Sequence, residues 1–565
     1  MTRRTSVGTA AWTMLVWSAA FAQPYWVEFK DKGDATGFDP YAYFAPEAVQ
    51  RHCLEYGAEF DSVDLPVCER YLEAVRAEGA QTGYASRWLN GVWVADGRVE
   101  CLAALPCVAR VYNLRDYART RDAQICGANR KCARAPRKPK LFDDAQTTHR
   151  PAARSEPPAN ARPQNPRTPQ KPRARHATGP ILELARAQLA RMQVEKLWQA
   201  GYNGAGVTIA VLDVGFWGVN KAPEFAHLFA ERRIVATRDF VRDRDGVFGW
   251  SDHGTQTLSC IAGMTAETAL GAAPAARFLL ARTERVLYEP LVEELWWLEA
   301  AEWAERNGAH IINSSLGYGD DRYDYRHMDG QFSIVARAAV KAVSRGLLVV
   351  NAAGNEGANK WKYITTPADA PGVLSVGGTD PATDAQIAFS SMGPTADGRL
   401  KPELCAYAKV AARGRSRVGT AFGTSFSAPL VAGFAAAVKQ MHPDWTVKQL
   451  FDALCRSGHL YPYFDYSHGY GVPQADKILR TPPDPPPTFS FLIDDGLIAV
   501  SIDRDALAPK KANLYWHVQG TDGRLRIYGA RRVYDERTVR FPGLKLERGE
   551  TLRVHFEGFT GEYAP

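Results

Sequence analysis

Four polar residues, each surrounded by glycine or other small residues, have side chains that together could carry out acyl transfer. They are the last residue of the run VTIAVLD, the first residue of HGTQTLSCIAG, the asparagine in AAGNEG and the first serine of GTSFSAPLVAG: Asp213, His253, Asn355 and Ser425. A serine hydroxyl becomes an effective nucleophile when a neutral imidazole takes its proton, and a buried carboxylate fixes the imidazole tautomer. We therefore predict a catalytic triad of Asp213, His253 and Ser425.

The oxyanion that forms during acyl transfer needs hydrogen-bond donors. The side-chain amide of Asn355 and the backbone N–H of Ser425, at the positive end of a predicted helix, could supply them. Taken singly, each residue has a structural interpretation as a turn former or a helix cap. Catalysis is favoured by the combination, because four complementary roles occur in the order Asp–His–Ser, which is one of the known orders for this geometry.

The elements that would position these residues are short apolar runs alternating with amphipathic helices between residues 181 and 480. The runs VTIAVLD, HIINSSLG, GLLVVNAAG and GVLSVGG are typical of strands buried on both faces. EELWWLEAAEWAERNG and FSIVARAAVKAVSRG are typical of the helices between them. This alternation predicts a three-layer α/β domain with a doubly wound parallel sheet, in which chemistry gathers at the carboxyl ends of the strands.

Two further domains are expected on either side. Residues 23–133 are cysteine-rich and contain a strand-like YWVEFKDKG, a helix-like VCERYLEAVRAEG and a strand-like SRWLNGVWVADG, which predicts an α+β domain. Residues 488–565 alternate apolar and polar side chains in FSFLIDDGLIAVSI, ANLYWHVQ, LRIYGA and LRVHFEGF, which predicts a small β-sandwich of unknown partner.

The basic character of the chain comes from residues 134–180. This segment has 11 Lys and Arg against 3 Asp and Glu, and nine prolines precede Pro180, while the whole chain has a net charge of +7. Such a composition predicts a disordered linker. The rest of the chain is close to neutral, which argues against nucleic acid as a partner.

The N-terminus indicates export. Arg3 and Arg4 precede an apolar run that ends in the small-x-small sequence Ala20-Phe21-Ala22, so residues 1–22 are predicted as a cleaved signal peptide. The alternative is an uncleaved anchor, for which the run is short. No later segment is long and apolar enough to cross a bilayer, so we expect a secreted or extracytoplasmic protein without a membrane partner.

Nine cysteines fit an exported protein. The close spacing of Cys101 to Cys107 and of Cys126 to Cys132 predicts local loops closed by disulfide bonds. The odd total leaves at least one free thiol. No spacing resembles a zinc site, so no metal ligand is predicted.

From Leu189 to Asp476 the sequence resembles the subtilisin-like serine proteases, or subtilases. The resemblance rests on AVLDVG, DHGTQTLSCIAG, NAAGNEG, GTSFSAPLVAG and FSSMGPTADGRLKPEL. It implies the Asp213–His253–Ser425 triad and Asn355 as oxyanion donor. It also implies substrate-binding walls around the residue before the scissile bond, formed by Ser315, Leu316, Gly317, Ala352, Ala353 and Gly354.

The same resemblance bears on cofactors and substrate preference. Members often bind structural calcium, but this sequence shows no clear ligand set, so no cofactor is expected and calcium ligands stay unassigned. We expect a broad preference with a large apolar residue in the pocket. Glu356 at the rim is an alternative that would attract a basic residue.

The N-terminal domain resembles the leader domains of exported subtilases. It is expected to be a propeptide that acts as an intramolecular inhibitor, and the alternative is a permanent accessory domain. We therefore expect a monomeric, secreted serine endopeptidase that is made as an inactive precursor and hydrolyses polypeptides through an acyl-enzyme. The alternatives are a catalytically silent binding protein with the subtilase fold and an α/β-hydrolase esterase, whose chain order does not fit.

Overall fold

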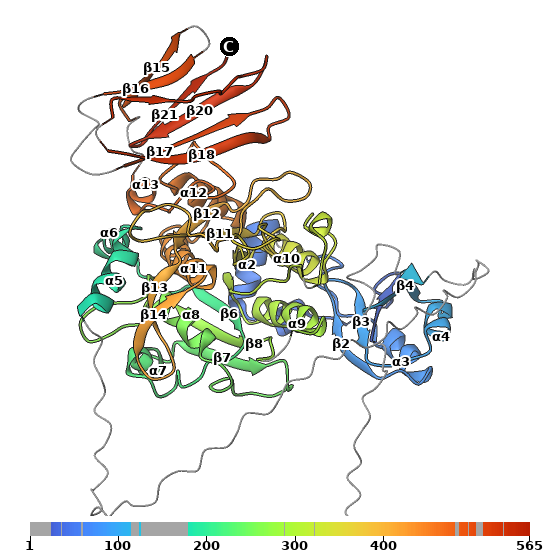
Figure 1. Ribbon diagram of the computed structural model, residues 1–565. Helices are drawn as coiled ribbons and strands as arrows, with labels where there is room; N and C mark the ends of the chain where they lie inside the picture. The colour runs from blue at the N-terminus through green and yellow to red at the C-terminus, as the bar shows by residue number, and fades with distance from the viewer. Residues whose placement is uncertain are drawn as a thin grey trace, which may run out of the picture.

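The computed structural model describes residues 24–34, 37–57, 60–114, 124–125, 179–286, 289–320, 322–480, 485–494, 497–503, 512–534 and 536–565. They form an N-terminal, a central and a C-terminal domain (Figure 1). The predicted signal peptide and residues 134–178 of the predicted linker lie outside the described residues. Helix α5 begins at Gly179, two residues inside the range predicted for the linker.

The central domain is built on a parallel sheet that has seven strands within the described residues, in the order β12-β11-β10-β9-β6-β8-β7. Four of these strands were predicted, and β7, β8 and β12 are additional. Their bounds are β6 Thr208–Asp213, β7 Ile234–Asp239, β8 Arg277–Arg282, β9 Ile311–Ser314, β10 Leu348–Ala352, β11 Leu374–Thr379 and β12 Leu404–Tyr407.

Helices cover both faces of this sheet. In the central strand β6, Val211 packs in the cluster formed with α8 (His253–Ala262) and α11 (Thr424–Met441). Its neighbour Leu212 faces α9 (Val292–Arg306) and α10 (Ile334–Ser344) on the other side. Successive side chains of a strand point to opposite faces, so a strand covered on both sides must be apolar throughout. The predicted three-layer α/β fold is confirmed.

The remaining elements of the central domain pack around these layers. They are α5 Gly179–Ala190, α6 Val194–Gln199, η1 Pro223–Phe225, α7 Ala226–Ala230, α9 Val292–Arg306, η2 Tyr325–His327, α10 Ile334–Ser344, the hairpin β13 Lys409–Arg413 and β14 Val418–Phe422, α12 Val447–Ser457 and α13 Ala475–Leu479.

The N-terminal domain is an antiparallel sheet in the order β2-β3-β1-β4-β5, as expected for an α+β fold. The predicted strand SRWLNGVWVADG is wrong in one respect, because a turn divides it. Asn90 in this turn has φ 46°, and at Gly91, where the next strand begins, a Cβ would lie 2.6 Å from the carbonyl oxygen of Val27 on the paired strand, so glycine lets the two strands approach closely. The elements are β1 Tyr25–Phe29, α1 Pro40–Tyr43, α2 Pro46–Tyr56, α3 Glu69–Ala77, β2 Thr82–Ser86, β3 Gly91–Val94, α4 Val99–Ala104, β4 Val108–Asn113 and β5 Gln124–Ile125.

The cysteines of the described residues are free thiols, so the predicted Cys101–Cys107 disulfide is not formed. Cys101 lies within α4, whereas Cys107 follows the end of this helix and lies near Cys68 and Asp31. Burial, reinforced by the negative charges of these two neighbours, raises the pKa of the Cys107 thiol. Cys126 and Cys132 lie outside the described residues.

The C-terminal domain consists of antiparallel sheets, as predicted. Three strands in the order β15-β16-β19 and four in the order β18-β17-β20-β21 share one apolar cluster that includes Val500 and Val554. His517 joins this domain to the central one, because its Nδ1 lies 2.6 Å from the carbonyl oxygen of Phe464. The strands are β15 Phe489–Asp494, β16 Leu497–Ile502, β17 Ala512–Gln519, β18 Leu525–Val533, β19 Thr538–Arg540, β20 Thr551–Phe556 and β21 Phe559–Tyr563.

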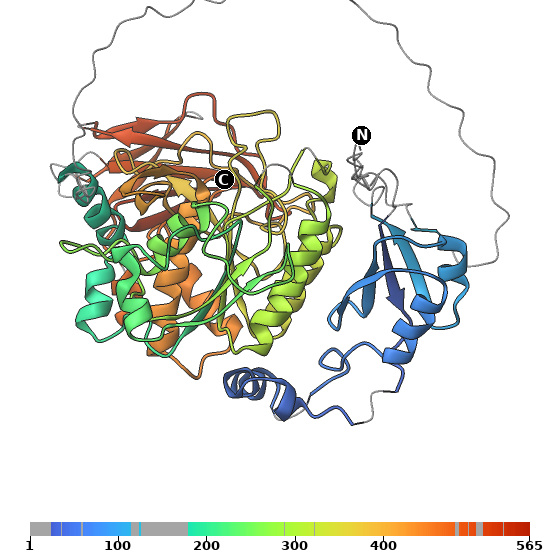
Figure 2. The same cartoon turned by 90° about the horizontal axis from the view of Figure 1, so that it is seen from below.

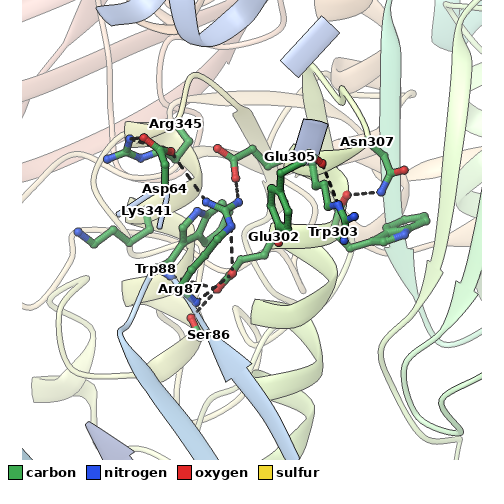
Figure 3. A network of polar contacts seen from close by, with 12 residues as sticks. Asp64, Ser86, Arg87, Trp88, Glu302, Trp303, Glu305, Asn307, Lys341 and Arg345 are labelled. Atoms are coloured by element: carbon green, nitrogen blue, oxygen red, sulfur yellow. Dashed lines mark hydrogen bonds and ion pairs between the residues drawn. The ribbon is translucent and has the colours of Figure 1, made fainter. Parts of the chain in front are cut away.

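The N-terminal domain lies beside the central domain on the side of α9 and α10, as Figures 1 and 2 show. Figure 3 shows the polar contacts between them. Buried Arg87 pairs with Glu305 and lies 3.5 Å from Glu302, both on α9. Asp64 lies 3.3 Å from Arg345 at the end of α10. These charges are buried in pairs, so separating the domains would leave unpaired charges on both sides.

A second contact comes from residues 39–64, which we call the arm. Its helix α2 carries Arg51, which is 5% exposed and donates to the carbonyl oxygens of Glu305, Ala309 and Arg345. These carbonyls lie at or just beyond the C-terminal ends of α9 and α10, where cations are favoured. On the same helix, Glu47 lies 2.9 Å from Arg277. The arm therefore adds contacts between the two domains beside those of Arg87, and the two sets meet at Glu305 and Asp64.

We predict that Arg51→Ala weakens the attachment of the N-terminal domain. The substitution leaves three carbonyl oxygens without their donor, so dissociation after cutting the 134–178 segment should be roughly 10- to 100-fold faster. The rate would be measured by separating the cleaved fragments in a Ser425→Ala background, which removes the candidate nucleophile.

Arg70→Ala is the matched control, because the Arg70 side chain is exposed and lies 4.0 Å from an exposed Asp34. Equal dissociation rates for the Arg51 and Arg70 variants would show that the Arg51 side chain contributes nothing to the attachment.

Candidate active site

Asp213 is a buried carboxylate at the carboxyl end of β6. Its side chain is 1% exposed. Oδ1 accepts from the backbone N–H of Val214 at 2.8 Å and lies 2.8 Å from His253 Nδ1, and Oδ2 accepts from the hydroxyl of Thr257 at 3.1 Å. Hydrogen bonds to the charged form favour it, so these donors allow a carboxylate to exist inside the protein.

His253 begins helix α8 directly beside this carboxylate. The N–H of Gly254 donates to the carbonyl of Gly215 at 3.1 Å, and a Cβ at Gly254 would lie only 2.5 Å from that oxygen. Glycine at 254 therefore lets the start of α8 approach the end of β6 and brings the ring to Asp213. The His253 side chain is 32% exposed, so its other ring nitrogen can be reached from the pocket.

The pKa of His253 is raised above its ordinary value of 6.5. Burial alone would lower it, because burial disfavours the charged ring. The negative charge of Asp213, its hydrogen bond to Nδ1 and the charge of Asp252 together outweigh burial. The imidazolium that forms when His253 accepts a proton is therefore stabilised in place.

Ser425 lies in the first turn of α11. Pro429, four residues later, has no N–H to donate to the carbonyl of Ser425, and this carbonyl instead accepts from the hydroxyl of Ser315 at 2.8 Å. In return, the hydroxyl of Ser425 donates to the carbonyl of Ser315 at 3.2 Å. Within the described chain, its hydrogen bond is to this carbonyl and not to His253, an arrangement common before substrate binds.

Asn355 follows β10 and its amide is oriented by Thr424. Its Oδ1 accepts from the backbone N–H of Thr424 at 2.9 Å and lies 3.1 Å from the Thr424 hydroxyl. With Oδ1 used in this way, Nδ2 remains the donor end of the side chain. Gly423, with φ 143°, is the residue next to this amide, since a Cβ there would lie 3.8 Å from Nδ2.

The side chains of His253, Asn355 and Ser425 line one pocket of about 380 Å³. Ala353, one of the predicted substrate-binding residues, is not in its lining, because it is 0% exposed and its backbone pairs with Val376 and Thr365. Of the predicted site residues, those that line the pocket are His253, Ser315, Leu316, Gly317, Ala352, Gly354, Asn355 and Ser425.

Two positioning residues were missed from the sequence. Thr257 lies one turn after His253 on α8, and this spacing was the available signal for a side chain directed at Asp213. Thr424 orients Asn355 across 69 residues of chain, and no local pattern reveals such a contact. A third omission is Glu284, which lines the same pocket.

Across the described ranges, no three His, Cys, Asp or Glu side chains are placed to bind a metal ion together. In the same part of the chain, no helix combines the length and apolar character needed to span a bilayer.

Comparison with known proteins agrees with this geometry. The model of the subtilase family matches residues 204–471, and that of the peptidase S8 propeptide domain of Bacteroidota matches residues 24–126. M-protease of Shouchella clausii (strain KSM-K16) is 29% identical over 263 residues, which are 46% of this chain and 61% of that protein. Subtilisin Savinase of Lederbergia lenta is also 29% identical over 263 residues, covering 87% of that protein. The match thus spans about three fifths of the first of these relatives.

Solved structures of other proteins are similar to part of this chain. MycP1 with its N-terminal propeptide removed has a TM-score of 0.42 and 26% identity, covering 53% of this chain and 98% of that one. A cold adapted subtilisin-like serine proteinase has a TM-score of 0.38 and 25% identity, covering 48% and 88%. Because the subtilase match contains all four candidate residues and the propeptide match covers the N-terminal domain, the chain belongs to the subtilase (peptidase S8) family of serine proteases and carries an N-terminal S8 propeptide domain.

Proposed function

We propose that this protein is a secreted serine endopeptidase, made as an inactive precursor, that hydrolyses polypeptides through Asp213, His253 and Ser425. The observation that carries the proposal is the 2.8 Å contact between a buried Asp213 carboxylate and His253 Nδ1, in a pocket that Ser425 shares. A carboxylate, an imidazole and a serine hydroxyl in this order supply the orienting acid, the base and the nucleophile of acyl transfer.

The first step is attack of Ser425 Oγ on the carbonyl carbon of the scissile peptide bond. His253 Nε2 takes the hydroxyl proton, and Asp213 stabilises the imidazolium that results. Asn355 Nδ2 and the backbone N–H of Ser425 donate to the oxyanion of the tetrahedral intermediate. The imidazolium then protonates the leaving amine, and water hydrolyses the acyl-enzyme by the same steps.

One rearrangement precedes this chemistry. The Ser425 hydroxyl must exchange its 3.2 Å hydrogen bond with the Ser315 carbonyl for one with His253. Rotation about a serine χ1 angle is inexpensive, and substrate binding commonly tightens such contacts.

The precursor part of the proposal rests on the contact between the propeptide and the peptidase domain. Two neighbouring sets of contacts hold them, one between Arg87 of the propeptide and glutamates of α9, and the other around Arg51 on the arm. Cutting the linker breaks one covalent connection and neither of these sets. The propeptide would therefore stay bound after cleavage, as an inhibitor must until it is degraded or displaced.

A fluorophosphonate probe tests the proposed function directly. It reacts with an activated serine, so the purified protein should gain the probe's mass at Ser425, and the Ser425→Ala variant should gain none. Intact-mass analysis before and after removal of residues 24–178 would also show whether cleavage in the linker depends on Ser425. If the trimmed wild-type protein is unlabelled, the site is not an active serine hydrolase.

We predict that Asp213→Asn lowers turnover by roughly four orders of magnitude, because the asparagine amide favours the wrong tautomer of His253. Asp444→Asn, a change at an exposed position, should leave turnover unaffected. Turnover of a peptide substrate and the far-UV circular dichroism of both variants would be compared. A folded Asp213→Asn protein with near-normal turnover would remove Asp213 from the mechanism.

The pH dependence of kcat/KM follows from the raised pKa of His253. Only the neutral ring accepts the serine proton, and a raised pKa keeps the ring protonated to higher pH, so activity should fall with an acid limb centred above pH 6.5. Asp252→Asn removes one of the charges that raise this pKa and should move the limb to lower pH. A profile that stays flat from pH 5 to pH 9 would contradict the role of His253.

A further inference from the structure

One end of the pocket is acidic. It extends past Leu316 and Gly317, which were predicted as walls for the residue before the scissile bond, to Glu284 and Glu289. Glu284 follows strand β8, and its preceding residue, Thr283, is fixed because its backbone N–H donates to the carbonyl of Asp213 at 3.0 Å. This hydrogen bond fixes the acidic end of the pocket to β6, the strand that ends at Asp213.

Several polar atoms at this end are buried without a partner. In the described part of the chain, Glu284 Oε1, Glu293 Oε2, Thr283 Oγ1 and the Tyr318 hydroxyl have no hydrogen-bond partner. Tyr318 is 2% exposed and lines the pocket, and Glu293 is 0% exposed. Buried polar groups normally have a partner because leaving one unpaired costs about 1–3 kcal/mol. Two of these atoms, Glu284 Oε1 and the Tyr318 hydroxyl oxygen, belong to residues that line the pocket, which indicates that the site is completed by a ligand with hydrogen-bond donors.

The cationic side chains nearest in sequence have other partners. Arg322 lies 2.7 Å from Glu294 and donates to the carbonyl of Glu289 at 2.8 Å. The guanidinium of Arg285 lies over the ring of Trp296, 5.3 Å from its centroid. Each of these two guanidinium groups therefore already has a partner of its own.

The local charges favour a positively charged ligand. Burial raises the pKa of Glu284, and the negative charges of Asp213, Glu293 and Glu289 raise it further. Burial likewise raises the pKa of Glu293 to about 7. A cation entering this end would relieve the repulsion among these carboxylates and would favour their ionised forms.

We propose that Glu284, together with Tyr318, binds an arginine or lysine side chain in one of the substrate residues that precede the scissile bond. This inference rests on the proposed endopeptidase function. Arginine suits the site best, because its guanidinium offers five donors in a planar fork and can bond a carboxylate and a hydroxyl together. The enzyme would then prefer a large apolar residue directly before the scissile bond, as predicted from the sequence, and a basic residue at another position before it.

Paired peptides test the proposal. Internally quenched substrates would carry arginine or its uncharged isostere citrulline at the second, third or fourth residue before the scissile bond. At one position, kcat/KM should favour arginine by about tenfold, since a desolvated charge pair contributes on the order of one factor of ten. Glu284→Gln should reduce this ratio to near one.

Two further variants separate this effect from a general disturbance. Glu267→Gln changes an exposed glutamate outside the pocket and should keep the full arginine-to-citrulline ratio. Tyr318→Phe removes only the unpaired hydroxyl and should lower the ratio by a smaller factor, about two- to fivefold. This variant keeps the test open if Glu284→Gln does not fold.

The outcomes are distinguishable from failure of the proposed function. Fluorophosphonate labelling counts active sites in every variant, so an unlabelled wild-type protein refutes the endopeptidase proposal itself. With labelling intact, an arginine preference of at least about threefold that falls in Glu284→Gln or Tyr318→Phe supports the inference. A smaller preference at every position, or one that both substitutions leave unchanged, overturns it and assigns the unpaired atoms to bound water.

Discussion

The burial of one carboxylate determines how the active site is assembled. Asp213 ends a strand that is covered on both faces, so its charge cannot be solvated by bulk water and must be met by donors from the protein. One donor comes from its own strand end and the other two from the first turns of α8, Thr257 and His253. Because α8 supplies two of the three donors, this helix must begin beside the end of β6. The hydrogen bond that orients the imidazole of His253 also stabilises the buried carboxylate of Asp213.

The small residues of the motifs serve the backbone contacts that this assembly requires. Gly254 allows α8 to come within hydrogen-bonding distance of the end of β6, and a side chain there would collide with the carbonyl of Gly215. Pro429 has a comparable effect in α11, since it frees the carbonyl of Ser425 to accept from Ser315. The two serines therefore bond reciprocally, carbonyl to hydroxyl in both directions, and this contact joins the helix of the candidate nucleophile to the loop that follows β9.

Sequence patterns predicted the strands and helices whose apolar side chains are continuous, and the candidate residues at their ends. They missed β8 because it begins and ends with arginines, Arg277 and Arg282, whose partners Glu47 and Asp239 are distant in sequence. Residue type alone also cannot separate functional pairs from structural ones. His468 lies 3.1 Å from Asp465, as a triad pair would, yet its Nε2 accepts from the backbone N–H of Gln386 and the ring is buried. Glu284 could not be predicted from the sequence, because the feature that distinguishes it is a carboxylate oxygen without a hydrogen-bond partner, and this is visible only in the three-dimensional structure.

The distribution of charge links substrate choice to activation. Eleven Lys and Arg against three Asp and Glu lie between residues 134 and 180, which accounts for the net charge of +7 and leaves the folded part close to neutral. Long-range steering by a nearly neutral surface is weak, and salt screens it beyond about 8–10 Å. Under the proposed preference, basic residues are therefore selected by contact inside the pocket with the half-buried Glu284. The segment of this chain that best satisfies such a pocket is its own linker, so one interaction would serve both the first cleavage, which separates the propeptide, and the choice of later substrates.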